Sequence, residues 1–518
     1  MTRRLEAAEP ELREAEAGPD HQHASHRAGH SWHPQLVALA RAERVFLAWL
    51  ALGVVGRLII ARSAWGGTDS DEATGILMAS RAAHGQFFSL FWGGNYGGTL
   101  STWIDGAFVW VFGLNVSVFR ATSILFALVA TVLLRLVAGR LVSRRAAIAT
   151  AVLFWVAPPD WVRWTMHEYV FWVPGICVAL GTVLCSLRWN EDRHDRRLWP
   201  IGFLTGVSFW MYFPLLALVI PAFVAVAWGL RRRPVSVLKL IALVPVGALP
   251  WLYAAVTRSL DTLKRSQVPS ETIAHRLVHT VTQVLPSSLF TSTRLHPSPR
   301  ILMVVGIVIL IAVAGFVIGQ AVRRQWPLAL AGTPVLLWPV LIAASGVDVS
   351  DGSYRYAFIV IPVLALLVAY VADRLRLSVV VPVAAAAVTA YGGAQTTTNW
   401  ASAPAYDRHL GAVSTFLISE HRTHVYAGYW VSYVLSVASE ERVTASATST
   451  VRDEQYEDLA AAAPQATFVF QADLGLDQQM MAWSHAHHVG RRVAVGGYAV
   501  WEFPMPVAAG SIPLGGVF

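Results

Sequence analysis

The chain has 518 residues, of which 55% are hydrophobic and only 14% are charged. Its mean hydropathy of +0.50 excludes an ordinary soluble protein of this length. The net charge of +8 does not indicate a nucleic-acid partner, because the arginines cluster in short connectors beside apolar runs, where the positive-inside rule accounts for them. We therefore expect a polytopic bundle of membrane-spanning α-helices.

Residues 1–42 are polar and rich in Glu, Ala and His, and no apolar stretch precedes Val45. This composition predicts a disordered cytoplasmic tail. Its histidines could hold a divalent metal, but a solvated low-complexity segment is the simpler interpretation of such residues in a flexible tail. They are His21, His23, His26, His30 and His33.

Residues 43–395 carry the predicted spans. If every arginine-rich connector is cytoplasmic, an even number of crossings must separate each connector from the next. The interval from Val45 to Arg140 is the exception, because it holds three apolar runs, 45–63, 99–113 and 118–139. The middle run, 99–113, is short for a span and carries Asp105. We expect it to be an interfacial or re-entrant helix, which leaves eleven spans with the N-terminus inside. The connectors are 41–44, 139–145, 188–197, 229–234, 322–327 and 372–377.

Two outer segments are long under this topology, 64–117 and 257–299. The first contains DSDEATGILMASRAAHGQFF, whose apolar spacing suits an amphipathic helix lying on the membrane. From 396 to 518 the composition becomes mixed, and short β-rich runs appear at 423–430, 466–472 and 493–503. We expect a small extracytoplasmic α/β domain there.

The acids Asp69, Asp71 and Glu72 follow the first predicted span directly. Acids at a lipid–water boundary are costly unless they are used or solvated, so this cluster predicts a catalytic or ligand-binding role. The alternative is that Ser70 or Asp71 merely caps a helix that starts near Glu72. Capping explains one acid but not three.

Two further clusters lie in outer loops. Arg163, His167 and Glu168 could face the same cavity as the first acids, although an aromatic interfacial belt with solvated charges explains them equally well. Tyr354 and Arg355 precede a later span, where the planar guanidinium suits a phosphate at headgroup depth. A snorkelling arginine is the alternative.

Tyr96 lies within the glycine-rich run 93–98. That run resembles a phosphate-binding loop only superficially, because it lacks the following Lys-Ser/Thr and the preceding strand. We expect a turn that leads into the re-entrant helix.

Together these features resemble the GT-C membrane glycosyltransferases. The stretch 69–188 carries the resemblance, with DEATGILMASRAAHGQFF, YGGTLSTWIDGAFVWVFG and FRATSILFALVATVLL, and with Arg120 at the start of the second span. The likeness is to the branch that contains protein O-mannosyltransferases and the lipid A aminoarabinose transferase (glycosyltransferase families 39 and 83). Downstream it rests on hydropathy, the SYRY motif and the outer C-terminal domain.

The resemblance implies an inverting glycosyltransferase that uses a polyprenyl-phosphate sugar donor and an extracytoplasmic glycan, lipid or protein acceptor. It implies that Asp71 is the catalytic base, with Glu72 beside it and Glu168 as a second acid. Some relatives have Glu-Lys where this chain has Gly97-Gly98, so the donor phosphate would fall to Arg163 or Arg355. Asp69, Tyr96, His167 and Tyr354 complete the candidate substrate-binding set.

The rival hypothesis is a transporter or flippase of lipid-linked saccharides. Such a protein would show internal repeats and ionisable or broken helices at the bilayer midplane. Here the acids lie at the predicted outer boundary, which favours the enzyme. We expect a plasma (inner) membrane location in contact with membrane lipids; no metal site is assigned, and a requirement for a divalent metal is left open.

Overall fold

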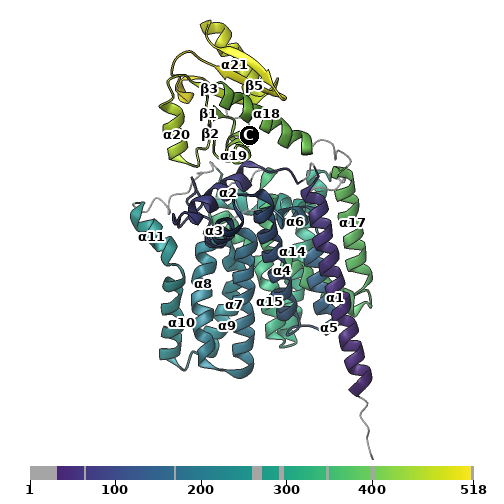
Figure 1. Ribbon diagram of the computed structural model, residues 1–518. Helices are drawn as coiled ribbons and strands as arrows, with labels where there is room; N and C mark the ends of the chain where they lie inside the picture. The colour runs from purple at the N-terminus through teal and green to yellow at the C-terminus, as the bar shows by residue number, and fades with distance from the viewer. Residues whose placement is uncertain are drawn as a thin grey trace, which may run out of the picture. The chain divides into compact units, whose positions relative to one another are not determined.

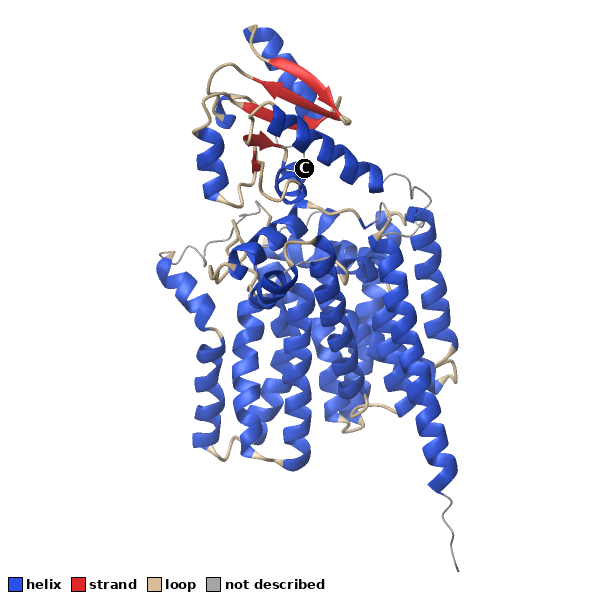
Figure 2. Cartoon of the chain, viewed as in Figure 1, coloured by secondary structure: helices blue, strands red, loops and turns tan. Residues whose placement is uncertain are grey.

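The computed structural model describes residues 32–63, 66–167, 171–258, 271–290, 297–345, 349, 351–397 and 403–514. Helices make up most of this part of the chain, and the strands it contains all lie near the C-terminus (Figure 2). The predicted fold class, a polytopic helical protein with a small C-terminal α/β domain, is confirmed. The first helix begins at Trp32, inside the segment 1–42 that we predicted to be a disordered tail. The tail histidines His21 to His30 lie outside the described residues.

The apolar runs predicted to span the membrane each correspond to a helix or to two consecutive helices. Among the described residues, six helices are long and apolar enough to cross a bilayer, or seven if the bent pair α10–α11 is one span. The remaining helices of this set are shorter, so the total of eleven spans stays a prediction. The set comprises α1 (Trp32–Ala61), α4 (Val116–Ala138), α5 (Arg144–Val156), α7 (Trp172–Asp192), α8 (Leu198–Met211), α9 (Leu216–Gly229), α10 (Pro234–Gly247), α11 (Leu249–Thr257), α14 (Pro299–Val322), α15 (Trp326–Ser345), α16 (Ile361–Arg374) and α17 (Val380–Thr397).

Short helices fill the connections between the long ones. The predicted interfacial helix is α3 (Leu100–Phe112), and it packs beside α2 (Ser70–Ala83) near the C-terminal domain (Figure 1). The others are α6 (Pro159–Trp164), η2 (Asp195–Arg197), η3 (Phe213–Leu215), α12 (Ile273–His279), the π-helical η5 (Thr280–Val284), α13 (Leu285–Phe290) and η6 (Asp351–Val360).

The prediction that α2 is an amphipathic helix with a solvated polar face is wrong, while its place at the membrane surface stays a prediction. Nearly every residue of α2 is buried, including the polar residues Glu72, Thr74 and Ser80. One side of α2 packs on α3, and another packs on a helix of the C-terminal domain. A covering domain removes the need for a polar outer face, which hydrophobic periodicity alone does not reveal.

The C-terminal domain is a five-stranded sheet with helices on both faces. Strands β1 (His424–Ala427), β2 (Thr444–Ala447) and β3 (Thr467–Gln471) are parallel, whereas β4 (Arg491–Val495) and β5 (Tyr498–Glu502) form an antiparallel hairpin on the β3 edge, which gives the order β2-β1-β3-β5-β4. The helical segments are α18 (Ala403–Ser419), α19 (Tyr429–Ala438), α20 (Glu454–Ala461), α21 (Gly475–His487) and η7 (Ala509–Ser511).

Sequence patterns located this sheet only in part. The run 423–430 contains β1 but ends in the first turn of α19, and the run 493–503 is a hairpin instead of one strand. The hairpin turns at Gly496 and Gly497, both of which have positive φ. β2 was not predicted, because its small residues carry little strand propensity.

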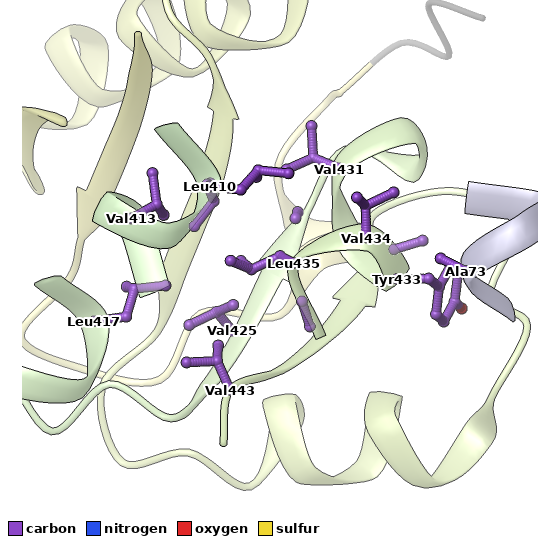
Figure 3. Packing of buried hydrophobic residues seen from close by; sticks show 14 of the residues in the cluster. Ala73, Leu410, Val413, Leu417, Val425, Val431, Tyr433, Val434, Leu435 and Val443 are labelled. Carbon is purple, nitrogen blue, oxygen red and sulfur yellow. The ribbon is translucent and has the colours of Figure 1, made fainter. Parts of the chain in front are cut away.

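The core on one face of the sheet reaches beyond the domain into α2. Ala73 and Leu77 of α2 are buried in the same cluster as Val425 of β1 and Tyr433 of α19. Figure 3 shows Ala73 next to Tyr433. The C-terminal domain is therefore seated on α2, the helix that carries the acid cluster.

Candidate active site

Asp69 caps the N-terminus of α2. Its carboxylate accepts the backbone N–H of Glu72 at 3.0 Å, while the backbone of Asp69 is extended. The alternative in which Ser70 or Asp71 is the cap is therefore wrong, and the Asp71 side chain is available for other contacts. Burial raises the pKa of Asp69, and the neighbouring carboxylates add to the effect, while His167 opposes it.

Glu72 is the centre of a buried ionic cluster. Its side chain has no exposed surface and accepts two hydrogen bonds from Arg120 of α4, at 3.1 and 3.0 Å. His167 Nδ1 lies 3.0 Å from the same carboxylate. Burial alone would raise the pKa of Glu72, but His167 and Arg120 outweigh it and hold that pKa well below its usual range. Glu72 therefore remains charged and is held in one position.

Arg120 also ties the cluster to the end of α1. Beyond Glu72, it donates to the carbonyl of Ala61 at 3.2 Å and to Thr68 Oγ1 at 3.1 Å. One guanidinium thus links α1, α2 and α4, and this linkage fixes where α2 begins.

Asp71 points to the opposite side, toward the C-terminal domain. Tyr429, the first residue of α19, donates its hydroxyl to Asp71 Oδ1 at 2.5 Å. Arg452 Nη2 lies 3.3 Å from Oδ1, and Arg355 Nη1 lies 3.7 Å from Oδ2. The Asp71 side chain keeps 18% of its surface exposed, so it is accessible as well as paired.

This exposed face of Asp71 lines a small pocket that is partly open to solvent. Aromatic rings form most of its wall, and the guanidinium groups of Arg355 and Arg452 are the cations that line it. The lining residues are Asp71, Phe91, Gly94, Tyr96, Trp164, Phe171, Trp172, Arg355, Tyr356 and Arg452. A carboxylate, two arginines and flat apolar walls form a site that can bind an anionic group beside an uncharged ring.

The run 93–98 is a turn that borders this pocket. Leu90 and Gly98 form an isolated antiparallel bridge, and the chain turns between them. Gly97 has a φ of +90°, and a Cβ there would lie 2.6 Å from the ring of Phe171, so this position needs glycine. The expected turn before α3 is confirmed, and it places Tyr96 in the pocket wall. Burial raises the pKa of Tyr96 strongly, so its hydroxyl stays neutral.

The two residues of the third predicted cluster, Tyr354 and Arg355, have different surroundings. Arg355 enters the pocket from η6, with its guanidinium over the rings of Trp164 and Tyr356 at 5.6 and 5.5 Å. Tyr354 points elsewhere and hydrogen-bonds with Asp160 of α6, near Arg163. Arg163 is not among the residues that line the pocket. Of these two arginines, only Arg355 lines the pocket.

The remaining predicted residues have separate positions. His167 contacts Glu72, as described above, and does not line the pocket. Glu168 lies outside the described residues. Within the described part of the chain, no three His, Cys, Asp or Glu side chains form a group that could hold a metal ion.

Sequence reasoning missed the contribution of the C-terminal domain. Tyr429 and Arg452 are 358 and 381 residues from Asp71 along the chain, and neither lies in a recognisable motif. Burial and Asp71 raise the pKa of Tyr429, so its hydroxyl remains a donor. Burial disfavours the charge on Arg452, but Tyr429 and Asp71 outweigh it and raise its pKa, so it stays cationic.

Solved structures show the same fold. ArnT from Cupriavidus metallidurans, solved with undecaprenyl phosphate, matches with a TM-score of 0.53 and 14% identity over 91% of this chain and 99% of that one. Its apo structure matches with a TM-score of 0.53 and 17% identity over 93% of this chain and 100% of that one. The resemblance to GT-C membrane glycosyltransferases is thereby confirmed for the fold.

A weaker likeness is to the oligosaccharyltransferase AglB from Archaeoglobus fulgidus, solved with an inhibitory peptide and a dolichol-phosphate. Its TM-score is 0.43 at 11% identity, over 82% of this chain and 69% of that one. No protein-family model and no curated protein matches the sequence.

Proposed function

We propose that this chain, with the fold of GT-C membrane glycosyltransferases, transfers a sugar from a polyprenyl-phosphate carrier to an extracytoplasmic acceptor. The observation that carries the proposal is the partly exposed Asp71 carboxylate in an aromatic pocket beside Arg355. The solved ArnT structure with undecaprenyl phosphate supports a lipid carrier as donor. The acceptor would be a glycan, lipid or protein of the cell envelope.

In this reaction Asp71 is the general base. It accepts the proton of the acceptor hydroxyl as the acceptor oxygen attacks the anomeric carbon, which inverts its configuration. The bond from that carbon to the phosphate oxygen breaks, and the electron pair stays on the phosphate. Arg355 stabilises the charge that grows there, and a guanidinium does so with paired donors.

The neighbouring groups have supporting roles. Glu72, held by Arg120 and His167, fixes the start of α2 and so positions Asp71. The rings of Trp172 and Phe171 offer flat apolar surfaces on which a sugar ring can stack, and the Tyr96 hydroxyl can hydrogen-bond to it. A role for Glu168 as a second acid remains a proposal from the resemblance alone.

The position of the pocket favours an enzyme over a transporter. Its walls come from the start of α2, the turn before α3, the outer end of α7 and a loop of the C-terminal domain. These segments lie at one end of the helical bundle, whereas a transporter binds its substrate near the bilayer midplane. The proposal places this end outside the plasma membrane and the N-terminus in the cytoplasm.

Analysis of the cell envelope tests the proposal whichever sugar is transferred. Mass spectrometry of glycans, lipids and proteins from a deletion strain should show the loss of one sugar residue from one acceptor class. The wild-type gene should restore that residue, and the Asp71→Asn gene should not. An unchanged envelope in the deletion strain would refute the proposed transferase.

A further inference from the structure

Two arginines from different parts of the chain meet across one carboxylate. Arg355 belongs to η6 in the helical bundle, and Arg452 belongs to the loop between β2 and α20 of the C-terminal domain. Each contacts a different oxygen of Asp71, at 3.7 and 3.3 Å. Both guanidinium groups therefore lie next to the same carboxylate and line the same pocket.

Arg452 is held in this position by several contacts. Its backbone N–H donates to the hydroxyl of Tyr433 at 2.6 Å, and its side chain donates to the hydroxyl of Tyr429 at 3.2 and 3.0 Å. Its guanidinium lies over the ring of Phe91 at 5.4 Å. The loop also packs closely against Gly93, where a Cβ would lie 2.8 Å from the carbonyl oxygen of Val451. Arg452 is thus placed in the pocket and is not a solvated surface arginine.

The sheet topology explains why this loop reaches the pocket. Tyr429 and Arg452 follow the carboxyl ends of the parallel strands β1 and β2, which lie side by side. Ligand-binding loops of α/β sheets gather at this end of the strands. The carboxyl ends of β1 and β2, where ligand contacts are usually found, therefore face Asp71.

The charge changes of the proposed reaction require two cations. A polyprenyl-phosphate sugar is a phosphodiester with one negative charge, and the polyprenyl phosphate that leaves carries nearly two at neutral pH. Asp71 loses one negative charge when it accepts the proton, as the phosphate gains one. Asp71 and the phosphate thus carry two negative charges throughout, which Arg355 and Arg452 together balance. Arg355 alone would leave one negative charge uncompensated in a largely aromatic pocket.

We propose that Arg452 is the second phosphate-binding group, so that the C-terminal domain completes the catalytic site and does more than brace the bundle. This inference rests on the proposed function. Arg452 would bind one phosphate oxygen while Arg355 binds another, since both already engage separate oxygens of one carboxylate. It would take the role left open by the absence of a lysine at Gly97-Gly98.

Binding of undecaprenyl phosphate to the purified full-length protein tests this assignment, with undecaprenol as the probe that lacks the phosphate. We expect the wild-type protein to bind undecaprenyl phosphate more tightly than undecaprenol. Arg452→Gln should weaken binding of undecaprenyl phosphate by about 10- to 100-fold and leave undecaprenol unaffected, because a charge-assisted hydrogen-bond pair is lost. Arg452→Lys should fall between, since it keeps the charge but loses the planar fork.

Arg442→Gln is the matched control, because Arg442 is exposed and precedes the opposite end of β2. It should bind both probes like the wild type. If Arg452→Gln binds undecaprenyl phosphate as tightly as the wild type does, the inference is overturned but the proposed function is not. The same holds if Arg452→Gln loses affinity for both probes equally, because Arg452 would then only support the structure of the site. A wild-type protein that does not distinguish the probes would overturn the proposed function as well. Thermal denaturation checks folding, and Arg452→Lys carries the test if the Gln variant does not fold.

Discussion

Asp71→Asn separates the chemical role of this residue from its structural contacts. The cap of α2 belongs to Asp69, so the substitution leaves helix initiation intact. The amide of asparagine has nearly the shape of the carboxylate, and its oxygen can still accept the Tyr429 hydroxyl. What it loses is the negative charge and the ability to accept a proton.

The contacts of Asp71 predict unequal effects on stability and on rate. The two ion pairs, at 3.3 and 3.7 Å, involve partly exposed side chains. An exposed pair contributes about 0.2–1 kcal/mol and removing one partner of a buried pair costs about 3–5 kcal/mol, so the loss of both largely buried pairs costs on the order of 2–4 kcal/mol of stability. Loss of a general base costs about 100- to 10,000-fold in rate, or roughly 3–5.5 kcal/mol of activation free energy. The rate should therefore fall far more than the folded population.

The assay is sugar transfer by purified protein, or restoration of the missing envelope sugar in a deletion strain, with thermal denaturation measured in parallel. Asp458→Asn is the matched control, because Asp458 is an exposed residue of α20. It should retain wild-type activity. Asp71→Asn protein that is folded, binds the lipid donor and transfers sugar at nearly the wild-type rate would refute Asp71 as the base.

Glu72→Gln should cost about 3–5 kcal/mol of stability, because it leaves buried cationic partners without their counter-charge. It should lower the rate per folded molecule less than Asp71→Asn does, and unchanged thermal stability would contradict the buried pairing. The lowered pKa of Glu72 stabilises the fold above about pH 4.3, and this contribution is lost as the pH falls toward the folded-state pKa. The difference in free energy of unfolding between wild type and Glu72→Gln should therefore become smaller as the pH falls. A difference that becomes larger in acid would contradict a lowered pKa of Glu72. Arg355→Ala should raise the KM for the lipid donor more than Arg355→Lys does, because lysine keeps the charge; wild-type turnover of both at limiting donor would exclude a phosphate contact. In a protein without its two native cysteines, a cysteine at the exposed position Gln86 should react with an impermeant reagent outside the cell and one at Arg144 should not; the reverse result would invert the topology.

Hydropathy predicted the membrane part of the fold well. The apolar runs that were predicted to span the membrane are helices. The short run that carries Asp105 is also a helix, α3, which packs beside α2. These features are local, because a bilayer imposes length and polarity on every segment separately. The same reasoning could not foresee that α2 is covered by another domain.

The candidate site was predictable only where its residues are near one another in sequence. Three acids at the start of α2 stood out because charge is unusual at that position. The sequence did not show which acid has which role. Asp69 caps α2, Glu72 pairs with Arg120 and His167, and Asp71 faces the pocket. Which way each side chain points depends on helix phase and on partners from distant segments. Arg452 was beyond reach, since only the seated C-terminal domain brings its loop to Asp71.

The three-way linkage made by Arg120 has a mechanical consequence. Sliding or tilting α2 would pull a buried ion pair apart and strain the end of α1 and the start of α4 at once. We therefore expect α2 to stay in place while substrates enter and leave. Any movement that opens the pocket should occur in the loops around α2. Hydrogen exchange should then be slow at the backbone amides of α2 and faster at those of the loop that carries Arg452.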